Sequence, residues 1–334
     1  MTARPVLHLI AEIGSVHDGS FGNAGRLIDA AAAAGADAVK LQTHIASAET
    51  LASAPSPGYF TAEDRMAYFE RTAFTPDQWA ALQQRAADAG VAFLSSAFSI
   101  EAVDLLEDIG VLAHKVASGE VTNLPLLERM AATGKPVYLS SGMSTWAELD
   151  AAVAVLRQGG PLVVMQCASR YPCPPEEVGL DVMVEMAERY GTPVGFSDHT
   201  LGHAAAVAAV ALGAEVVEKH FTFSTLMYGS DAQHSMEPGP FAQLAVMLGE
   251  ARAARDAVVD KDRAAAELGD MKRIFEKSVV TGRALDAGHV LTGDDLAYKK
   301  PGDGFPASRY RELLGRRLAR AVPADHQLSE GDVT

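Results

Sequence analysis

The stretch PVGFSDHTLGHAAAVAAVALGAEVVEKH, residues 193–220, decides the fold. It contains two short apolar strands, Pro193–Phe196 and Glu215–Val217, separated by an alanine- and valine-rich helix at residues 203–212. Two strands joined by a helix of this length predict a βαβ unit, in which the neighbouring strands run parallel. Both strands then end at the same edge of the sheet, which in a parallel barrel is where catalytic residues gather.

A histidine follows each of these two strands, His199 after the first and His220 after the second. Two imidazoles on adjacent strand ends can hold one divalent metal ion. The alternative is a pair of unrelated histidines, one satisfying a loop backbone and the other packed in the core. The flanking residues Ser197, Asp198 and Glu218 favour a functional cluster. Both interpretations stay open at this point.

The same alternation of strand and helix runs through the preceding residues. The other predicted strands are Val6–Ile13, Ala38–Gln42, Ala92–Ser95, His114–Val116, Pro136–Ser140 and Pro161–Gln166. Eight strand–helix units over roughly 260 residues predict an α/β fold, a (β/α)8 TIM barrel. No G-x-G-x-x-G follows the first strand, which disfavours a dinucleotide-binding fold. Residues 43–74 form a long irregular stretch, which suggests an active-site loop.

The composition and the residue pattern of the sequence change near residue 261. We predict a barrel catalytic domain over residues 1–260, a charged linker over residues 261–275 and a small domain over residues 276–334. Short alternating runs broken by glycine and proline predict short strands and turns in the small domain, without long helices. Because its core is small, this domain is expected to lean on a partner surface.

Composition excludes several classes of function. The net charge of −15 argues against a general nucleic-acid binder, which needs clustered lysine and arginine. No uninterrupted apolar run reaches the ~18 residues of a membrane span. The N-terminus does not resemble a signal peptide, so we expect a cytoplasmic protein. Two cysteines are too few for a disulfide framework.

Charged and hydroxyl side chains follow most of the predicted strands. They include Glu12, Lys40, Gln42, Ser95, Ser96, Lys115, Ser118, Glu120, Ser140, Ser141, Gln166, Ser169 and Tyr171. Serine hydroxyls and lysine ammonium groups on one rim can cradle a phosphate. A lysine inside a barrel needs an anionic partner. The alternative to a ligand is that Lys40 and Lys115 form buried ion pairs with Glu12 and Glu120.

Several ordered motifs resemble one enzyme family. They are AEIGSVHDGS, GADAVKLQ, HKVASGEVTNLPLLERMAATGKPVYLSSGMST, QCASRYPCPPEEVGL, PVGFSDHTLG, EKHFT and KKPGDG followed by LLGRRLAR. The chain resembles the N-acetylneuraminate (sialic acid) synthase family, which also makes legionaminic, pseudaminic and related nonulosonic acids. The resemblance covers essentially the whole chain except residues 43–74. It implies that residues 276–334 form an antifreeze-like (β-clip) domain.

The resemblance also implies a reaction and its partners. The family condenses phosphoenolpyruvate with an N-acylated mannosamine-type sugar and water, giving phosphate and a nine-carbon 3-deoxy-2-keto acid by C–O cleavage. It uses a divalent metal, for which manganese is expected here, with magnesium or cobalt as alternatives. It forms a domain-swapped homodimer in which the antifreeze-like domain covers the partner's barrel mouth.

The family's functional residues carry over position by position. The implied metal ligands are His199 and His220, and the implied phosphoenolpyruvate contacts are Lys40, Ser96, Lys115, Ser118, Ser140, Ser169 and Ser197. The implied sugar contacts are Glu12, Glu120, Tyr171, Asp231 and, across the dimer, Lys300. Glu120 is assigned the proton of the attacking water, with Glu12 and Lys115 as the other catalytic residues. Lys300 stands where the family often has arginine and Ser169 where many members have asparagine, which bears on the acceptor sugar.

Two other classes of function remain as alternatives. A metal-dependent aldolase acting on pyruvate would also use two histidines and a strand-end glutamate, but it would not need a phosphate cradle. A non-catalytic carbohydrate-binding protein could be built on the same barrel.

Overall fold

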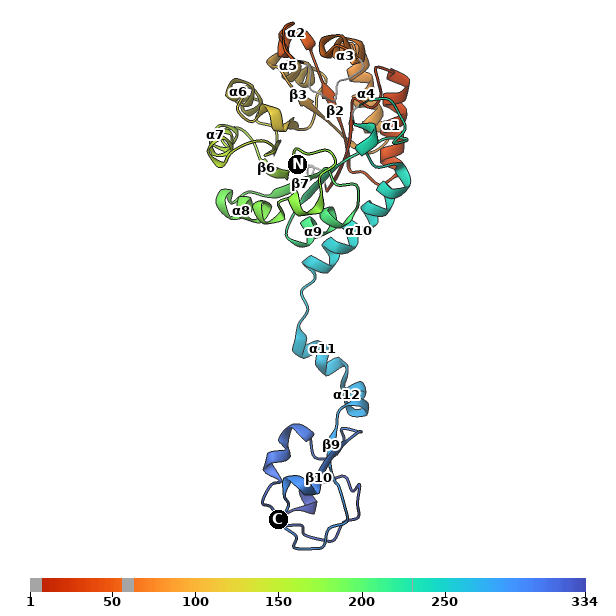
Figure 1. Cartoon of the computed structure of the whole chain (residues 1–334), viewed down its shortest axis with the longest axis vertical. Helices are drawn as coiled ribbons and strands as arrows, with labels where there is room; N and C mark the ends of the chain where they lie inside the picture. The colour runs from red at the N-terminus through yellow and green to blue at the C-terminus, as the bar shows by residue number, and fades with distance from the viewer. Residues whose placement is uncertain (1–7, 56–62, 230) are drawn as a thin grey trace. The chain divides into compact units, whose positions relative to one another are not determined.

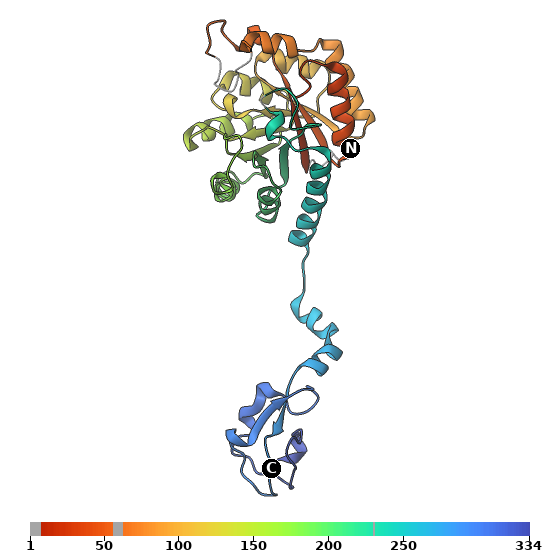
Figure 2. The same ribbon diagram turned by 45° about the vertical axis from the view of Figure 1, so that its right-hand side comes forward.

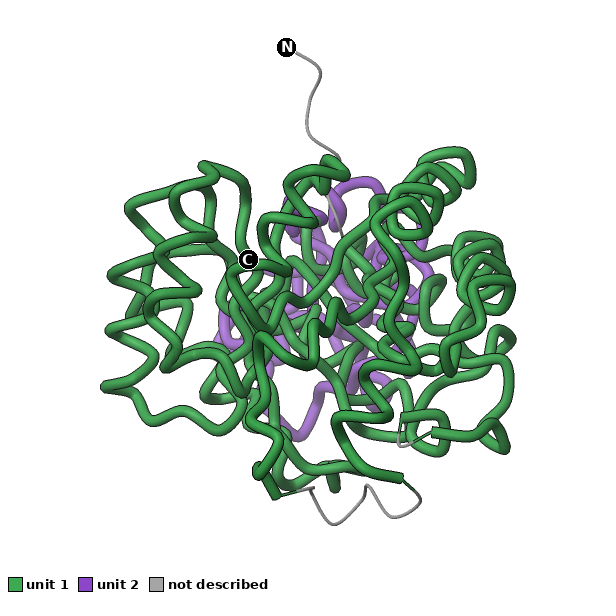
Figure 3. Tube along the Cα trace, turned by 90° about the horizontal axis from the view of Figure 1, so that it is seen from above, with its two compact units in different colours: residues 1–256 green, residues 257–334 purple. Residues whose placement is uncertain are grey.

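The computed structural model describes residues 8–55, 63–229 and 231–334 (Figure 1). The chain divides into two compact units, Met1–Asp256 and Ala257–Thr334, which Figure 3 shows in different colours.

The first unit is a closed barrel of eight parallel strands that follow one another in sequence order, so the predicted (β/α)8 fold is confirmed. The strands are β1 (Leu9–Gly14), β2 (Ala38–Thr43), β3 (Ala92–Ala97), β4 (His114–Val116), β5 (Val137–Ser140), β6 (Leu162–Cys167), β7 (Val194–Asp198) and β8 (Val216–His220). Helices surround them (Figures 1 and 2). These helices are α1 (Phe21–Ala33), α4 (Pro76–Asp88), α5 (Ile100–Asp108), α6 (Leu124–Ala132), α7 (Trp146–Leu156), α8 (Leu180–Tyr190), α9 (Ala204–Ala211) and α10 (Pro238–Asp256).

Side chains alternate between the inside of the barrel and the helix layer along each strand. The large apolar cluster lies between strands and helices, and a smaller one, including Ile10, Leu94 and Val216, fills the inside of the barrel. Two residues beyond Ile10 and Val216, on the same faces, stand Glu12 and Glu218. The inner face therefore changes from apolar to charged toward the carboxyl ends of the strands.

The prediction that residues 43–74 are irregular is wrong for the described part of that segment. It contains α2 (Ala46–Glu49) and α3 (Arg65–Thr72), while residues 56–62 lie outside the described residues. The carboxylate of Asp64 begins α3 by accepting from the N–H groups of Met66 and Ala67. Both helices are shorter than the 11-residue window in which a helical period shows in sequence.

The second unit contains the residues of the predicted linker and small domain. Helices α11 (Lys261–Glu267) and α12 (Gly269–Phe275) begin it, and neither buries a side chain in the described chain. Strands β9 (Ser278–Thr281) and β10 (Leu296–Lys299) then pair antiparallel. The remaining elements are isolated bridges and single 3-10 turns, as the absence of long helical patterns predicted.

Two buried carboxylates organise the small core of this unit in the same way. Asp295 accepts from the hydroxyl and N–H of Thr292 and pairs with an arginine and a histidine, Arg283 and His289. Asp332 receives the equivalent set from a serine, an arginine and a histidine: Ser329, Arg320 and His326. Burial alone would raise the carboxyl pKa of Asp295 and of Asp332. The hydrogen-bond partners have the larger combined effect and hold both pKa values below the usual range.

Within the described part of the chain, no helix combines the length and the apolar character needed to cross a membrane.

On the outer face of β7 and β8, Asp198 and Lys219 form a fully buried ion pair. Lys219 Nζ lies 2.7 Å from Asp198 Oδ2, and both side chains are at most 1% exposed. The ammonium group also donates to the carbonyls of Thr200 and Gly202, while Asp198 accepts from the N–H of Thr200. The pair therefore ties the loop that carries His199 to the neighbouring strand.

We predict that Lys219→Met destabilises the barrel by about 3–5 kcal/mol, because it leaves the Asp198 carboxylate buried and unpaired. Urea unfolding followed by the fluorescence of Trp79 and Trp146, the chain's two tryptophans, measures this. The matched control is Arg129→Met, which removes a partly exposed pair with Asp104 and should cost ~0–1 kcal/mol. Equal losses in the two variants would contradict the prediction.

Candidate active site

Lys40 lies at the centre of a buried cluster inside the barrel. Its Nζ lies 2.9 Å from Glu12 Oε2 and 3.6 Å from Glu218 Oε1, and it donates to Ser96 Oγ at 3.2 Å. The register of the sheet makes this possible, since Glu12 is paired with Lys40 across β1 and β2.

Lys115 lies on the other side of the Glu218 carboxylate. Its Nζ donates to Ser140 Oγ at 2.6 Å and to the Val116 carbonyl at 3.2 Å, and it lies 3.7 Å from Glu218 Oε1. Ser197 donates its hydroxyl to the same carboxylate oxygen at 3.0 Å. One glutamate thus joins both lysines, and the serine hydroxyls line the space around them.

The predicted ion pairs are half right. Lys40 pairs with Glu12, but Lys115 pairs with Glu218, and no Lys115–Glu120 pair occurs among the described residues. Glu120 ends the 3-10 turn η1 (Ser118–Glu120), beyond the end of β4, and accepts from Asn123 Nδ2 at 2.8 Å. Burial raises the pKa of the Glu120 carboxyl.

The cluster pushes the pKa values of its two carboxylates apart. Burial disfavours the charged form of Glu218, but Lys115 and Lys40 outweigh it and lower its pKa. For Glu12 burial wins over Lys40, and the pKa is raised. Burial also opposes charge on Lys40, yet Glu12 and Glu218 overcome it and raise the pKa of the ammonium group. Lys40 therefore stays cationic inside the barrel.

His199 and His220 lie side by side, with ring centroids 5.4 Å apart. His199 Nδ1 lies 2.8 Å from the Ala168 carbonyl, and its Nε2 lies 2.9 Å from the Tyr171 hydroxyl. A carbonyl can only accept, so Nδ1 carries a proton, and in the neutral ring Nε2 is the nitrogen with the lone pair. The His220 Nδ1 is buried and has no hydrogen-bond partner among the described residues.

These two imidazoles fit a divalent cation. Their rings are close enough to reach one ion between them, and a carbonyl that fixes one ring nitrogen is a common arrangement for histidine ligands. Among the residues that the structure describes, no group of three His, Cys, Asp or Glu side chains could hold a metal ion alone. A metal ion held by these two imidazoles would therefore need further ligands besides the two nitrogens.

Tyr171 and Cys167 border the histidines. The Tyr171 ring packs on His199 with centroids 4.0 Å apart and on His220 edge-on at 5.8 Å. Cys167 Sγ lies 3.9 Å from His199 Nδ1 and accepts from Ser118 Oγ at 3.5 Å. The sequence analysis gave Cys167 no role, although it ends β6 at the inner face.

Two predicted phosphoenolpyruvate contacts come together at Gly142, where φ is +28°. A Cβ at this position would lie 2.0 Å from Ser118 Cβ and 2.8 Å from Ser169 Oγ. Only glycine allows these two serines, from the loops after β4 and β6, to approach so closely.

Asp231 and Lys300 complete the predicted set. A Cβ on Gly14 would lie 2.9 Å from Asp231 Oδ2 and 3.4 Å from Glu12 Oε1, so these two carboxylates face the same glycine. Lys300 belongs to the second unit, where its Nζ lies 4.7 Å from the ring centroid of Phe275.

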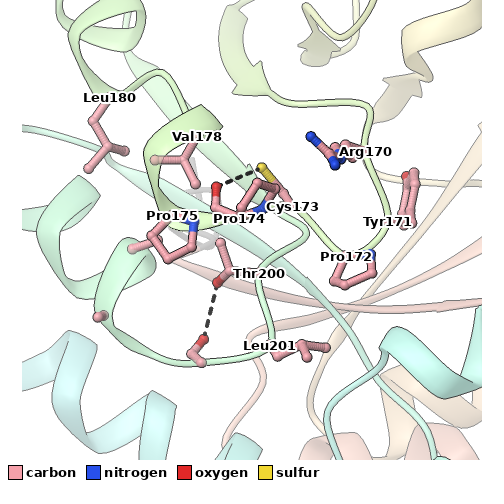
Figure 4. Close-up of a pocket in the computed structure, with 13 residues that line it drawn as sticks. Arg170, Tyr171, Pro172, Cys173, Pro174, Pro175, Val178, Leu180, Thr200 and Leu201 are labelled. Atoms are coloured by element: carbon pink, nitrogen blue, oxygen red, sulfur yellow. Dashed lines mark hydrogen bonds between the residues drawn. The ribbon is translucent and has the colours of Figure 1, made fainter.

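A cavity of about 770 Å³ opens behind Tyr171, between the loops that follow β6 and β7 (Figure 4). Its walls are mainly apolar, with Pro174, Leu180 and Leu201 among them. Arg170 is also part of its lining and pairs with Glu177. Tyr171 alone of the predicted site residues lines it, so the cavity adjoins the rim without holding its charges.

A closed parallel barrel with a cationic, hydroxyl-lined mouth beside paired histidines defines a (β/α)8-barrel enzyme. Residues 27–261 match the NeuB family and residues 276–334 match the SAF domain. The chain belongs to the NeuB family, the nonulosonic acid synthases. The predicted resemblance, the antifreeze-like domain and the assignment as a synthase-type transferase are thereby confirmed.

Relatives match over nearly the whole length of the chain. It is 34% identical to the N,N'-diacetyllegionaminic acid synthase of Campylobacter jejuni, over 96% of this chain and 98% of that protein. It is 33% identical to the N-acetylneuraminate-9-phosphate synthase of Homo sapiens, over 96% and 91%. The crystal structure of an N-acetylneuraminic acid synthetase from Leptospira borgpetersenii matches with a TM-score of 0.70 and 28% identity, over 80% of this chain and 93% of that one.

We predict that Gly142→Ala weakens anion binding by displacing Ser118 and Ser169. The thermal stabilisation produced by inorganic phosphate should fall by at least half. The matched control is Gly110→Ala, at φ +79° with open space around its Cβ position, which tests backbone strain alone. An unchanged phosphate response in Gly142→Ala would contradict the prediction.

Proposed function

We propose that the protein condenses phosphoenolpyruvate with an N-acylated mannosamine-type sugar, giving a nine-carbon 3-deoxy-2-keto acid and phosphate. The observation that carries this proposal is the position of Lys40 and Lys115 with their serines on the same rim as His199 and His220. The printed names of the relatives, a diacetyllegionaminic acid synthase and an N-acetylneuraminate-9-phosphate synthase, support the same substrate class.

The phosphate of phosphoenolpyruvate is assigned to the lysine–serine side. Lys40 and Lys115 already donate to Ser96 and Ser140 and lie beside carboxylates there, so a phosphate would offer its own oxygens to the two ammonium groups in place of these partners. Ser118, Ser169 and Ser197 supply further hydroxyls around it. Donors held in place stabilise the charge of the phosphate as it leaves, without reorganisation during the reaction.

The sugar is assigned to the side formed by Glu12, Glu120, Tyr171 and Asp231. A divalent ion, manganese by preference with magnesium or cobalt as alternatives, would be held by His199 and His220 and would act as a Lewis acid on the aldehyde oxygen. Tyr171, half-exposed at the mouth, then shapes the entrance beside the two imidazoles.

The reaction needs no nucleophile from the protein, because an enol ester is already activated. Carbon 3 of phosphoenolpyruvate attacks the aldehyde carbon, and carbon 2 becomes electron-poor. Water adds at carbon 2, and the phosphate leaves when its C–O bond breaks. We assign the water's proton to Glu120, whose burial raises the carboxyl pKa and so makes it a better proton acceptor.

Lys300 extends the proposal to a dimer. We assign it to the mouth of a partner's barrel, reached by the antifreeze-like domain of a swapped dimer. There an ammonium group gives a point charge, whereas an arginine would give a planar fork to an acyl carbonyl.

The decisive experiment is an assay of phosphate release with phosphoenolpyruvate, a divalent metal and a panel of hexosamines, with product masses measured. Turnover that depends on phosphoenolpyruvate supports the proposal. Turnover with pyruvate alone would instead identify an aldolase, and sugar binding without turnover would identify a carbohydrate-binding protein.

We predict that His220→Ala abolishes turnover, because one of the two proposed metal ligands is lost, while the thermal unfolding curve keeps its shape. The control is His203→Ala, which removes a histidine of the β7–α9 loop whose Nε2 lies 3.0 Å from the carbonyl oxygen of Pro240. Full metal-dependent activity of His220→Ala would show that the metal assignment is wrong.

A further inference from the structure

A chain of hydrogen bonds runs from the segment after β2 to Glu12. His44 Nδ1 lies 2.7 Å from Glu49 Oε1, at the end of α2, and His44 Nε2 lies 3.2 Å from Gln42 Oε1. Gln42 Nε2 in turn donates to Glu12 Oε1 at 2.9 Å. The link from Glu12 to α2 is therefore continuous across four side chains.

The imidazole of His44 is held rigidly in this chain. It is stacked between Phe69 of α3 and Phe98 after β3, with centroid distances of 3.8 and 4.2 Å and an interplanar angle of 13° in both cases. The His44 and Glu49 side chains are only 7% and 5% exposed. A cation between two aromatic faces is favoured by their electron-rich surfaces.

The partners determine the protonation of His44. The Glu49 carboxylate and the Gln42 amide oxygen can only accept, so both ring nitrogens of His44 must donate. With Glu12 ionised, reversing the Gln42 amide would set its oxygen against a carboxylate oxygen, which is repulsive. In the orientation that the structure shows, both ring nitrogens of His44 face acceptors, and the Glu49 carboxylate lies beside the ring.

We propose that His44, kept doubly protonated by Glu49, is a positioning residue that orients the Gln42 amide toward Glu12 and so shapes the acceptor-sugar side of the site. The inference rests on the proposed function, in which Glu12 contacts the sugar. It gives the α2–α3 segment, expected from the sequence to be an active-site loop, a specific role at the acceptor side.

The surroundings of the pair agree with a place at the acceptor side. Burial raises the pKa of Glu120, another carboxylate assigned to the sugar; the nearby charge of Glu49 raises it further, while those of His44 and Arg65 lower it. His17 also lies within range of the His44 charge, and its own pKa is lowered mainly by burial and further by that charge. The His44–Glu49 pair therefore lies close to two of the three acceptor-side carboxylates, joined to Glu12 through Gln42 and within range of the Glu120 charge.

His44→Phe tests the inference, because phenylalanine keeps the aromatic stack and removes both N–H groups. With the best sugar of the hexosamine panel, N-acetylmannosamine included, we expect the KM for the sugar to rise about tenfold, as for loss of one hydrogen bond to a charged group. The KM for phosphoenolpyruvate should stay within twofold. A purely structural role would instead leave both KM values unchanged and lower only stability.

A double-mutant cycle with Gln42→Leu tests the route. If His44 acts through Gln42, the double variant loses no more sugar affinity than Gln42→Leu alone. Additive losses would overturn the inference. The matched control is His17→Asn, which removes another buried imidazole that packs on an aromatic ring and whose Nδ1 accepts from the N–H of Gly19. Its KM for the sugar should remain unchanged.

A measurement that does not depend on turnover separates this inference from the proposed function. In ¹⁵N-labelled protein at pH 7.5, the ring nitrogens of His44 should both show the chemical shift of a protonated nitrogen. The signals are assigned by their loss in His44→Phe, or by their change in Glu49→Gln if that variant does not fold. An unprotonated ring nitrogen on His44 would overturn the inference, whereas an inactive wild-type enzyme would contradict only the proposed function.

Discussion

The structure depends on a charge network that is closed inside an apolar barrel. The Glu218 carboxylate lies between Lys40 and Lys115, 3.6 and 3.7 Å from their ammonium groups, and all three side chains are buried. Two lysines cannot remain charged in such surroundings without carboxylates, and the carboxylates cannot remain charged without them. The ion-pair and ligand interpretations are therefore compatible, because Glu12 and Glu218 overcome burial and keep Lys40 cationic, ready to attract an anion.

One strand register places both this network and its support. Across β7 and β8, Ser197 is paired with Glu218 and the next pair is Asp198 with Lys219. Successive residues point to opposite faces, so the first pair lies inside the barrel and the second lies under the helix layer. A one-residue slip in the register would move Ser197 and Glu218 to the outer face and Asp198 and Lys219 to the inner face. The same register therefore fixes both the inner-face cluster and the ion pair that holds the His199 loop.

Much of this could be predicted from sequence, because strand–helix periodicity fixes which residues reach the rim. The pairing of His199 with His220 follows from one βαβ unit, and the structure brings the two rings together. The partner of Lys115 could not be chosen, since the sequence places Glu120 and Glu218 alike near predicted strand ends; in the structure Glu120 lies in the turn η1 beyond β4, whereas Glu218 lies within β8. His44 was missed although it continues the period of two set by Lys40 and Gln42, because its meaning depends on Glu49 in a helix of one turn.

The two halves of the rim are built differently, and this bears on what can vary in the family. The lysine–serine side comes mostly from strands, whereas the proposed acceptor side has only Glu12 on a strand among its assigned residues and otherwise comes from η1, the loop after β6, the segment after β8 and the α2–α3 segment. Loops change more readily than a hydrogen-bonded barrel. Relatives at 34% and 33% identity carry the names of different acids, diacetyllegionaminic acid and N-acetylneuraminate-9-phosphate, over nearly equal shares of the chain. Selectivity for the sugar should therefore reside in those loops, where a side chain such as His44 can alter the acceptor side without disturbing the lysine network.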